Sequence, residues 1–206
     1  MPPMLRPPDD GGKPAAVLIL FSDGDAVGDV GETGPDVLLV RRSAAVRKHA
    51  GQPAFPGGAI DATDGGAVPA ALREAAEETG IDPSGVQIVA VLPELYIWRS
   101  DFRVTPVIGW WHTPGPVAPG DPAEIDMVAR IPVAELVDPA NRLMVRYPGG
   151  QGGPAFRAGG LLVWGFTAAL LDQVLTLGGW EQPWDASHVT ELSATELSAG
   201  WSATGT

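Results

Sequence analysis

Residues 73–80 read Arg-Glu-Ala-Ala-Glu-Glu-Thr-Gly, and the turn Phe55-Pro56-Gly57-Gly58 ends fifteen residues before them. In a helix, Glu74, Glu77 and Glu78 would share one face, because successive residues turn by about 100°. The opposite face would carry a buried stripe, at Leu72, Ala75, Ala76 and Thr79. Three adjacent like charges cost a helix roughly 0.2–0.5 kcal/mol per pair. Because hard divalent cations such as Mg²⁺ or Mn²⁺ prefer carboxylate oxygens, the cluster indicates a metal site.

An acidic helix face can also be merely solvated, so the flanking residues matter. The glutamates lie between a glycine turn and Gly80, which is expected to end the helix, and Arg73 directly precedes the first of them. This long pattern in a turn–helix context favours a catalytic role over a solvated surface.

The composition excludes several classes of protein. The chain has 206 residues, is 45% hydrophobic and contains no cysteine. One globular domain is therefore expected, without disulfides, thiolate metal ligands or cysteine nucleophiles. The net charge of −12 argues against non-specific nucleic-acid binding. With no signal-like leader and no apolar run of the about 20 residues that cross a bilayer, we expect a cytoplasmic protein without membrane contact.

A basic segment stands out in this acidic chain. Arg41, Arg42, Arg47 and Lys48 fall within eight positions and are followed by His49. Such an island indicates a local anionic ligand, although a solvated loop that balances nearby acids has the same composition.

Periodicity and turn residues predict an α/β fold with a mixed sheet. Pro106 suggests that its strand lies at a sheet edge or carries a bulge. Residues 1–14 are expected to be flexible, 15–180 to form the domain, and 181–206 to be a disordered acidic tail. The expected strands are 15–21, 36–41, 86–92, 102–111 and 124–131, the expected helices are 67–79, 133–137 and 161–177, and 147–153 is expected to be a flexible turn.

The segment from Gly58 to Ile81 resembles the Nudix box, the signature of metal-dependent hydrolases of nucleoside diphosphate derivatives. The half that reads Arg-Glu-x-x-Glu-Glu-x-Gly is intact. Three features depart from the family pattern: the loop is one residue longer, Asp64 replaces Glu, and Ala75 replaces a larger aliphatic residue. The resemblance implies an α/β/α sandwich with a loop-helix-loop catalytic motif.

Upstream residues are similar to the motif of coenzyme A pyrophosphatases within that family. The similarity covers Leu38-Leu39-Val40-Arg41-Arg42-Ser43, then Arg47, Gly51 and Phe55-Pro56-Gly57-Gly58, without a gap. Val40 stands in place of Thr, and Pro53 in place of Val. Weaker similarity extends the match to roughly residues 15–177.

The resemblance implies a role for each part of the site. Glu74, Glu77, Glu78 and the carbonyl of Gly58 would bind Mg²⁺ or Mn²⁺, and Arg73 would orient a glutamate. The base would be Glu74 or Glu124, and a homodimer is common among relatives. The expected contacts to a small-molecule substrate are Arg41, Ser43, Arg47, His49, Phe55 and Gly57.

Each of these residues has a structural alternative. Arg47 can form surface ion pairs, His49 can bond within its loop, Ser43 can cap a turn and Glu124 can be a surface acid. Phe55 can anchor the core, and Gly57-Gly58 can be a plain turn. The alternatives to coenzyme A hydrolysis are another Nudix substrate (ADP-ribose, a dinucleotide or an oxidised nucleotide), a nucleotide-binding module without catalysis, and a structural domain with an incidental acidic helix.

Overall fold

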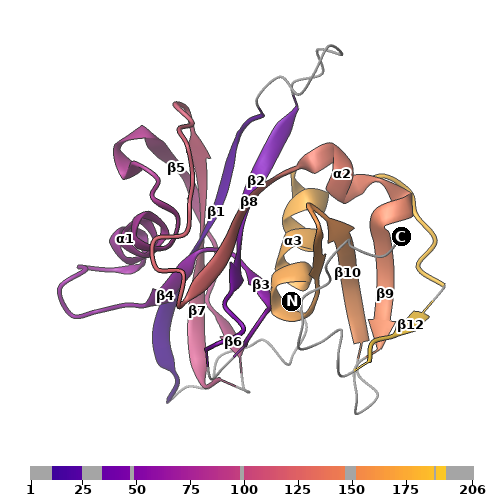
Figure 1. Cartoon of the computed structure of the whole chain (residues 1–206), viewed down its shortest axis with the longest axis horizontal. Helices are drawn as coiled ribbons and strands as arrows, with labels where there is room; N and C mark the ends of the chain where they lie inside the picture. Colours follow the sequence, from indigo (N-terminus) through magenta and orange to yellow (C-terminus); the bar gives the residue numbers. More distant parts are fainter. Residues whose placement is uncertain are drawn as a thin grey trace. The chain divides into compact units, whose positions relative to one another are not determined.

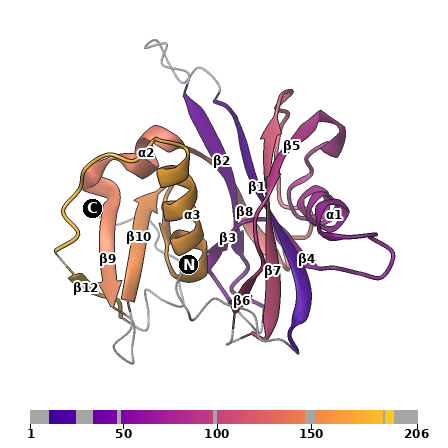
Figure 2. The same cartoon turned by 180° about the vertical axis from the view of Figure 1, so that it is seen from behind.

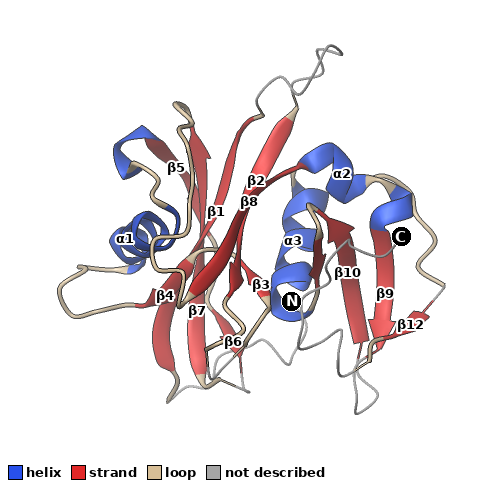
Figure 3. Cartoon of the chain, viewed as in Figure 1, coloured by secondary structure: helices blue, strands red, loops and turns tan. Residues whose placement is uncertain are grey.

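In the computed structural model, residues 11–24, 34–46, 49–97, 100–146, 152–187 and 189–193 are described. The chain divides into two units. The first comprises Met1–Asp23 and Phe55–Asp121, and the second comprises Gly24–Ala54 and Pro122–Thr206. Both units contain helices as well as strands, which confirms the α/β class expected from the sequence (Figure 3).

The first unit is built around β7 (Phe102–Trp111), which has partners along both sides. β1 (Lys13–Asp23) runs parallel to it, with Ile19 opposite Ile108. β5 (Val86–Val91) and β6 (Leu95–Ile97) pair with it antiparallel. β4 (Gly57–Ala59) pairs antiparallel with β1, which joins the glycine turn to the sheet.

Of the two possibilities predicted from Pro106, an edge or a bulge, the edge is wrong, because β7 has neighbours on both sides. β5 ends opposite Val107 and β6 begins opposite Val104, so Pro106 faces the interruption between them. Its carbonyl accepts a hydrogen bond from the Leu92 N–H at 2.9 Å. A residue that lacks an N–H is tolerated at such a break. The neighbouring strand also carries an irregularity, between Ile88 and Ala90.

The glutamate helix, α1 (Ala67–Thr79), has the predicted bounds and packs on β1 and β4 (Figures 1 and 2). Gly80 ends it in the left-handed conformation, at φ 74°. The predicted buried stripe needs correction, because Leu72 and Ala76 are only half-buried. The buried residues are Ala70, Ala71, Ala75, Glu78 and Thr79. One of the three glutamates therefore lies on the buried side of the helix, and a short 3₁₀ turn (Pro83–Gly85) follows before β5.

The second unit contains two groups of paired strands. β2 (Pro35–Arg42) pairs antiparallel with β3 (Pro53–Ala54) and β8 (Ile125–Pro132). The other sheet has the order β11-β10-β9-β12. Its strands are β11 (Leu161–Val163), β10 (Gly152–Ala158), β9 (Arg142–Arg146) and β12 (Val189–Glu191). The helices are α2 (Val133–Val137) and α3 (Gly165–Leu177), with a 3₁₀ turn at Pro139–Asn141.

The helix predicted over 161–177 begins four residues later, at Gly165. Residues Leu161–Val163 form β11, which pairs with β10 after a turn at Gly159 and Gly160, both with positive φ. A short apolar run is compatible with either a buried strand or a buried helix, so its periodicity did not separate the two.

The sequence also did not predict β9, β10 or β12. Within the segment expected to be a disordered tail, β12 runs parallel to β9, and Leu192 is buried against Val145 and Leu162. Residues 147–151, in the predicted flexible turn, and 194–206 lie outside the described residues. Among the helices that the structure describes, none has the length and apolar character required to cross a membrane.

Candidate active site

The glycine turn contacts the most buried glutamate directly. The Gly57 N–H donates a hydrogen bond to Glu78 Oε2 at 3.0 Å, and Glu78 is buried. A Cβ on Gly57 would collide with the carbonyl of Ala16 and with Val17 on β1. The turn therefore requires glycine here, and its backbone fixes one carboxylate of α1.

The next residue, Gly58, lies against the side chain of Glu74. A Cβ on Gly58 would lie 2.5 Å from the Glu74 carboxyl carbon, a separation that real side chains do not tolerate. The absence of a side chain thus lets the carboxylate rest against the backbone of β4. Two consecutive glycines contact two different glutamates of the helix.

Arg73 joins the loop before α1 to the helix itself. Its Nε and Nη2 donate to the two oxygens of Asp64, at 2.8 and 3.0 Å. Nη1 donates to Glu74 Oε1 at 2.9 Å and to Glu77 Oε2 at 3.1 Å, and Nη2 also reaches the Ala59 carbonyl at 3.3 Å. Arg73 therefore contacts two of the three glutamates, and its role in orienting them stays a prediction.

The charges of this cluster shift several protonation equilibria. Hydrogen bonds from Arg73 lower the pKa of Asp64, assisted by the backbone N–H of Asp61. Burial raises the pKa of Glu74, and the neighbouring Arg73 partly opposes that effect. Asp64 in turn raises the pKa of Arg73 far above its ordinary value, so the guanidinium stays charged.

The donor set fits a hard divalent cation, because it consists of carboxylate oxygens. Within the described residues, however, no three acidic or histidine side chains converge on one point. Glu78 turns to the Gly57 N–H, whereas Glu74 and Glu77 turn to Arg73. The carboxylates are thus of the kind that binds a metal ion, but in this structure each of them is hydrogen-bonded to a protein group.

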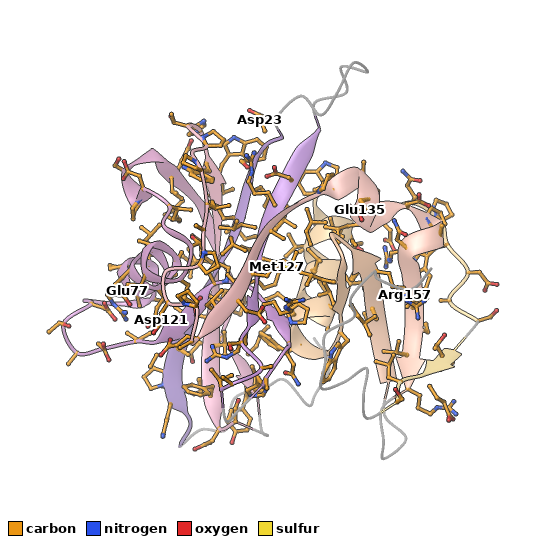
Figure 4. All side chains as sticks on the ribbon, viewed as in Figure 1. Asp23, Glu77, Asp121, Met127, Glu135 and Arg157 are labelled. Carbon is orange, nitrogen blue, oxygen red and sulfur yellow. The ribbon has the colours of Figure 1, made fainter. Side chains whose placement is uncertain are left out.

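A second loop, which the sequence did not single out, binds the C-terminal end of α1. The Ala118 N–H donates to the Thr79 carbonyl at 3.0 Å, and the Gly120 N–H to the Glu78 carbonyl at 3.1 Å. A Cβ on Gly120 would overlap the Glu77 carbonyl. Figure 4 labels Glu77 and Asp121, the residue after Gly120, in the same part of the molecule.

The remaining predicted site residues fall mostly in the second unit. Arg41 donates through Nε to Asp126 Oδ1 at 2.7 Å. The Ser43 N–H bonds to the Glu124 carbonyl at 2.7 Å, and the Ser43 hydroxyl accepts from the Ala45 N–H, as expected of a turn cap. His49 Nδ1 lies 2.9 Å from Gln52 Oε1, in its own loop.

Two further predicted residues complete the account. Phe55 belongs to the first unit and is buried, which agrees with a core anchor. Arg47 lies outside the described residues. The structure therefore gathers Gly57, Gly58, Arg73 and the glutamates in one unit, and Arg41, Ser43 and Glu124 in the other.

Sequence comparison with known proteins finds the family whose signature the segment from Gly58 to Ile81 resembles. The NUDIX domain model matches residues 12–147. A protein of Pectobacterium atrosepticum named "Uncharacterized Nudix hydrolase NudL" is 49% identical over 109 residues, which is 53% of this chain and 52% of that protein. The Escherichia coli K12 protein of the same name is 55% identical over 75 residues, or 36% and 38% of the two chains. The chain thus matches about half the length, or less, of these curated relatives.

Solved structures share the fold at low identity. A Nudix hydrolase from M. smegmatis, RenU, has a TM-score of 0.57 at 18% identity, over 85% of this chain and 91% of the other. A NUDIX hydrolase from Nitrosomonas europaea has a TM-score of 0.53 at 16% identity, over 89% and 80%. At such identities the likeness concerns the fold alone.

Proposed function

The chain belongs to the Nudix family, and on that premise we propose that it is a metal-dependent pyrophosphohydrolase that cleaves coenzyme A or a derivative. The products would be 3′,5′-ADP and 4′-phosphopantetheine. The observation that carries the hydrolase proposal is the direct contact between the Gly57-Gly58 turn and the carboxylates of Glu78 and Glu74.

Glu74, Glu77, Glu78 and the carbonyl of Gly58 would hold Mg²⁺ or Mn²⁺. When bound, such an ion neutralises pyrophosphate charge and lowers the pKa of a coordinated water. A structural domain with an incidental acidic helix would have no need of glycines shaped around two of its glutamates. This contact argues for the catalytic interpretation.

The protein's own groups have separate tasks in this proposal. The Gly57 N–H holds Glu78 in one orientation, and Arg73 holds Glu74. Glu74, or Glu124, would accept the proton of the attacking water. Burial raises the pKa of the Glu74 carboxyl, and the neighbouring Arg73 partly opposes that effect.

The substrate proposal depends on the segment from Leu38 to Gly58, which resembles the coenzyme A pyrophosphatase motif. Guanidinium groups bind phosphate through two parallel N–H groups, so Arg41 and Arg47 are suited to an anionic substrate. The names of the relatives give the family and leave the substrate open.

The decisive experiment is incubation of the whole chain with coenzyme A and Mg²⁺, followed by identification of both products. We expect 3′,5′-ADP and 4′-phosphopantetheine in equal amounts, and their loss in the presence of EDTA. A Glu78→Gln protein should lose activity by roughly two orders of magnitude or more, because a metal ligand has been neutralised. Normal turnover by that variant would rule out the mechanism.

The replacements at Val40 and Pro53 support a second candidate, a Nudix hydrolase with another nucleotide substrate. A panel with ADP-ribose, a dinucleotide and an oxidised nucleotide separates the two candidates. Faster turnover of any of these than of coenzyme A would favour the second. Tight coenzyme A binding without product would instead support a non-catalytic module.

A further inference from the structure

The side chain of Arg41 is held from one side by an acidic residue that the sequence did not single out. Arg41 Nε donates to Asp126 Oδ1 at 2.7 Å, and both side chains are partly buried. The two residues are 85 positions apart in the chain and meet because β2 pairs with β8. Asp126 therefore occupies the side of the guanidinium that carries Nε.

A break in the strand register brings Asp126 to this position. Arg41 lies opposite Met127, but the next residue, Arg42, lies opposite Ile125, so Asp126 is the extra residue of a bulge (Figure 4 labels Met127). Bulges turn a side chain away from the regular alternation of a strand and are frequent beside functional sites. After the bulge, the Ser43 N–H and the Glu124 carbonyl resume the pairing at 2.7 Å.

The opposite edge of the same guanidinium is not engaged. Within the part of the chain that the structure describes, neither Nη1 nor Nη2 of Arg41 donates to an acceptor. An arginine fixed through Nε presents its two terminal nitrogens as a preformed pair of donors. Two parallel N–H groups match two oxygens of one phosphate.

We propose that Asp126 is a positioning residue, which fixes Arg41 so that its terminal nitrogens bind a phosphate monoester of the substrate. The identity of that monoester rests on the proposed function. Coenzyme A carries a 3′-phosphate monoester in addition to its pyrophosphate, and a dianion of this kind needs a cationic partner. Asp126 thereby serves recognition of the 3′-phosphate and takes no part in bond cleavage.

The test is calorimetric binding of 3′,5′-ADP and 5′-AMP to the whole chain in EDTA, so that no catalysis is needed. We expect the wild type to bind 3′,5′-ADP at least tenfold more tightly, the difference that roughly 1.5 kcal/mol of charge-assisted hydrogen bonding provides. Arg41→Gln should abolish this preference. Asp126→Asn should reduce it several-fold, and Asp126→Glu should retain part of it.

Glu191→Gln is the matched control, since it removes the same unit of charge at an exposed side chain of the second unit and should leave the preference unchanged. The inference is overturned if the wild type does not prefer 3′,5′-ADP. It is also overturned if Asp126→Asn has no effect, or tightens binding, because the carboxylate would then compete with the ligand. Failure of coenzyme A cleavage with Mg²⁺ would refute the proposed function and leave this binding result standing.

Discussion

Arg73 and Asp64 form a two-point ion pair, in which Nε and Nη2 of the arginine reach the two carboxylate oxygens at 2.8 and 3.0 Å. Asp64 also accepts the Asp61 N–H at 2.7 Å, so the loop that precedes α1 is closed on itself. The same arginine contacts Glu74 and Glu77. The shape of the loop and the direction of the carboxylates therefore depend on one guanidinium.

Replacement of Asp64 by Asn should destabilise the protein in a pH-dependent manner. The pKa of Asp64 is below its ordinary value of 3.8 in the native state, so its contribution is complete above that value and is lost as the pH falls through the lowered native pKa. We expect the free energies of unfolding of the variant and the wild type, measured with urea between about pH 3 and 7, to become similar at the acidic end of that range.

Asp61→Asn is the matched control for this experiment. The Asp61 side chain is 68% exposed and lies 3.8 Å from Arg73, whereas that of Asp64 is 5% exposed. An exposed pair at this distance contributes at most about 1 kcal/mol. An equal effect of the two variants would show that the two-point geometry is unimportant.

Arg73→Lys should lower both stability and activity. Lysine keeps the charge but cannot donate to Asp64 through two parallel N–H groups while also reaching Glu74. We expect a loss on the order of 1–3 kcal/mol in the free energy of unfolding, together with lower kcat at saturating Mg²⁺. An unchanged kcat would mean that Arg73 does not orient the glutamates.

Gly58→Ala should disturb the site through a steric effect. The new methyl group would lie 2.5 Å from the Glu74 carboxyl carbon, so the carboxylate must move. Because the carboxylate is the end of a flexible side chain, we expect only a small loss in the free energy of unfolding. Gly115→Ala is a suitable control, because the nearest atom to its Cβ is 4.0 Å away. Glu74→Asp in the Gly58→Ala background should recover melting temperature, and a failure to do so would contradict the proposed clash.

The sequence predicted the site better where the contacts are local. The bounds of α1 and its stop at Gly80 follow from helical spacing and capping. The burial of Glu78 did not, because it depends on a hydrogen bond to Gly57, 21 positions away. Asp126 could not be identified at all, since a bulge in β8 decides which residue faces Arg41, and no local signal specifies it.

Truncation should reveal a structural role for the segment after α3. Arg142 is buried, pairs with Asp172 and lies 4.8 and 4.5 Å from the ring centroids of Phe156 and Trp184. Deleting residues 178–206 removes Trp184 and the buried Leu192. We expect a loss of at least about 2 kcal/mol in the free energy of unfolding, from the leucine alone.

Deletion of 194–206 is the matched control, because it keeps β12 and Leu192. That variant keeps the docked segment, so it should lose less free energy of unfolding than the deletion of 178–206. Equal destabilisation by the two truncations would contradict a structural role for the docked segment. Composition predicted disorder after residue 180, whereas the pairing of β12 with β9 depends on residues more than 40 positions apart.

The hydrogen bonds that close the end of α1 run from backbone to backbone, at Ala118 and Gly120. These contacts do not depend on the identity of the side chains in the loop. The exception is Gly120, where the Glu77 carbonyl leaves no space for a Cβ. The loop can therefore diverge in sequence while the helix that carries the glutamates keeps its length. The side chains of residues 113–119 can therefore be changed by evolution or by protein engineering without rebuilding α1.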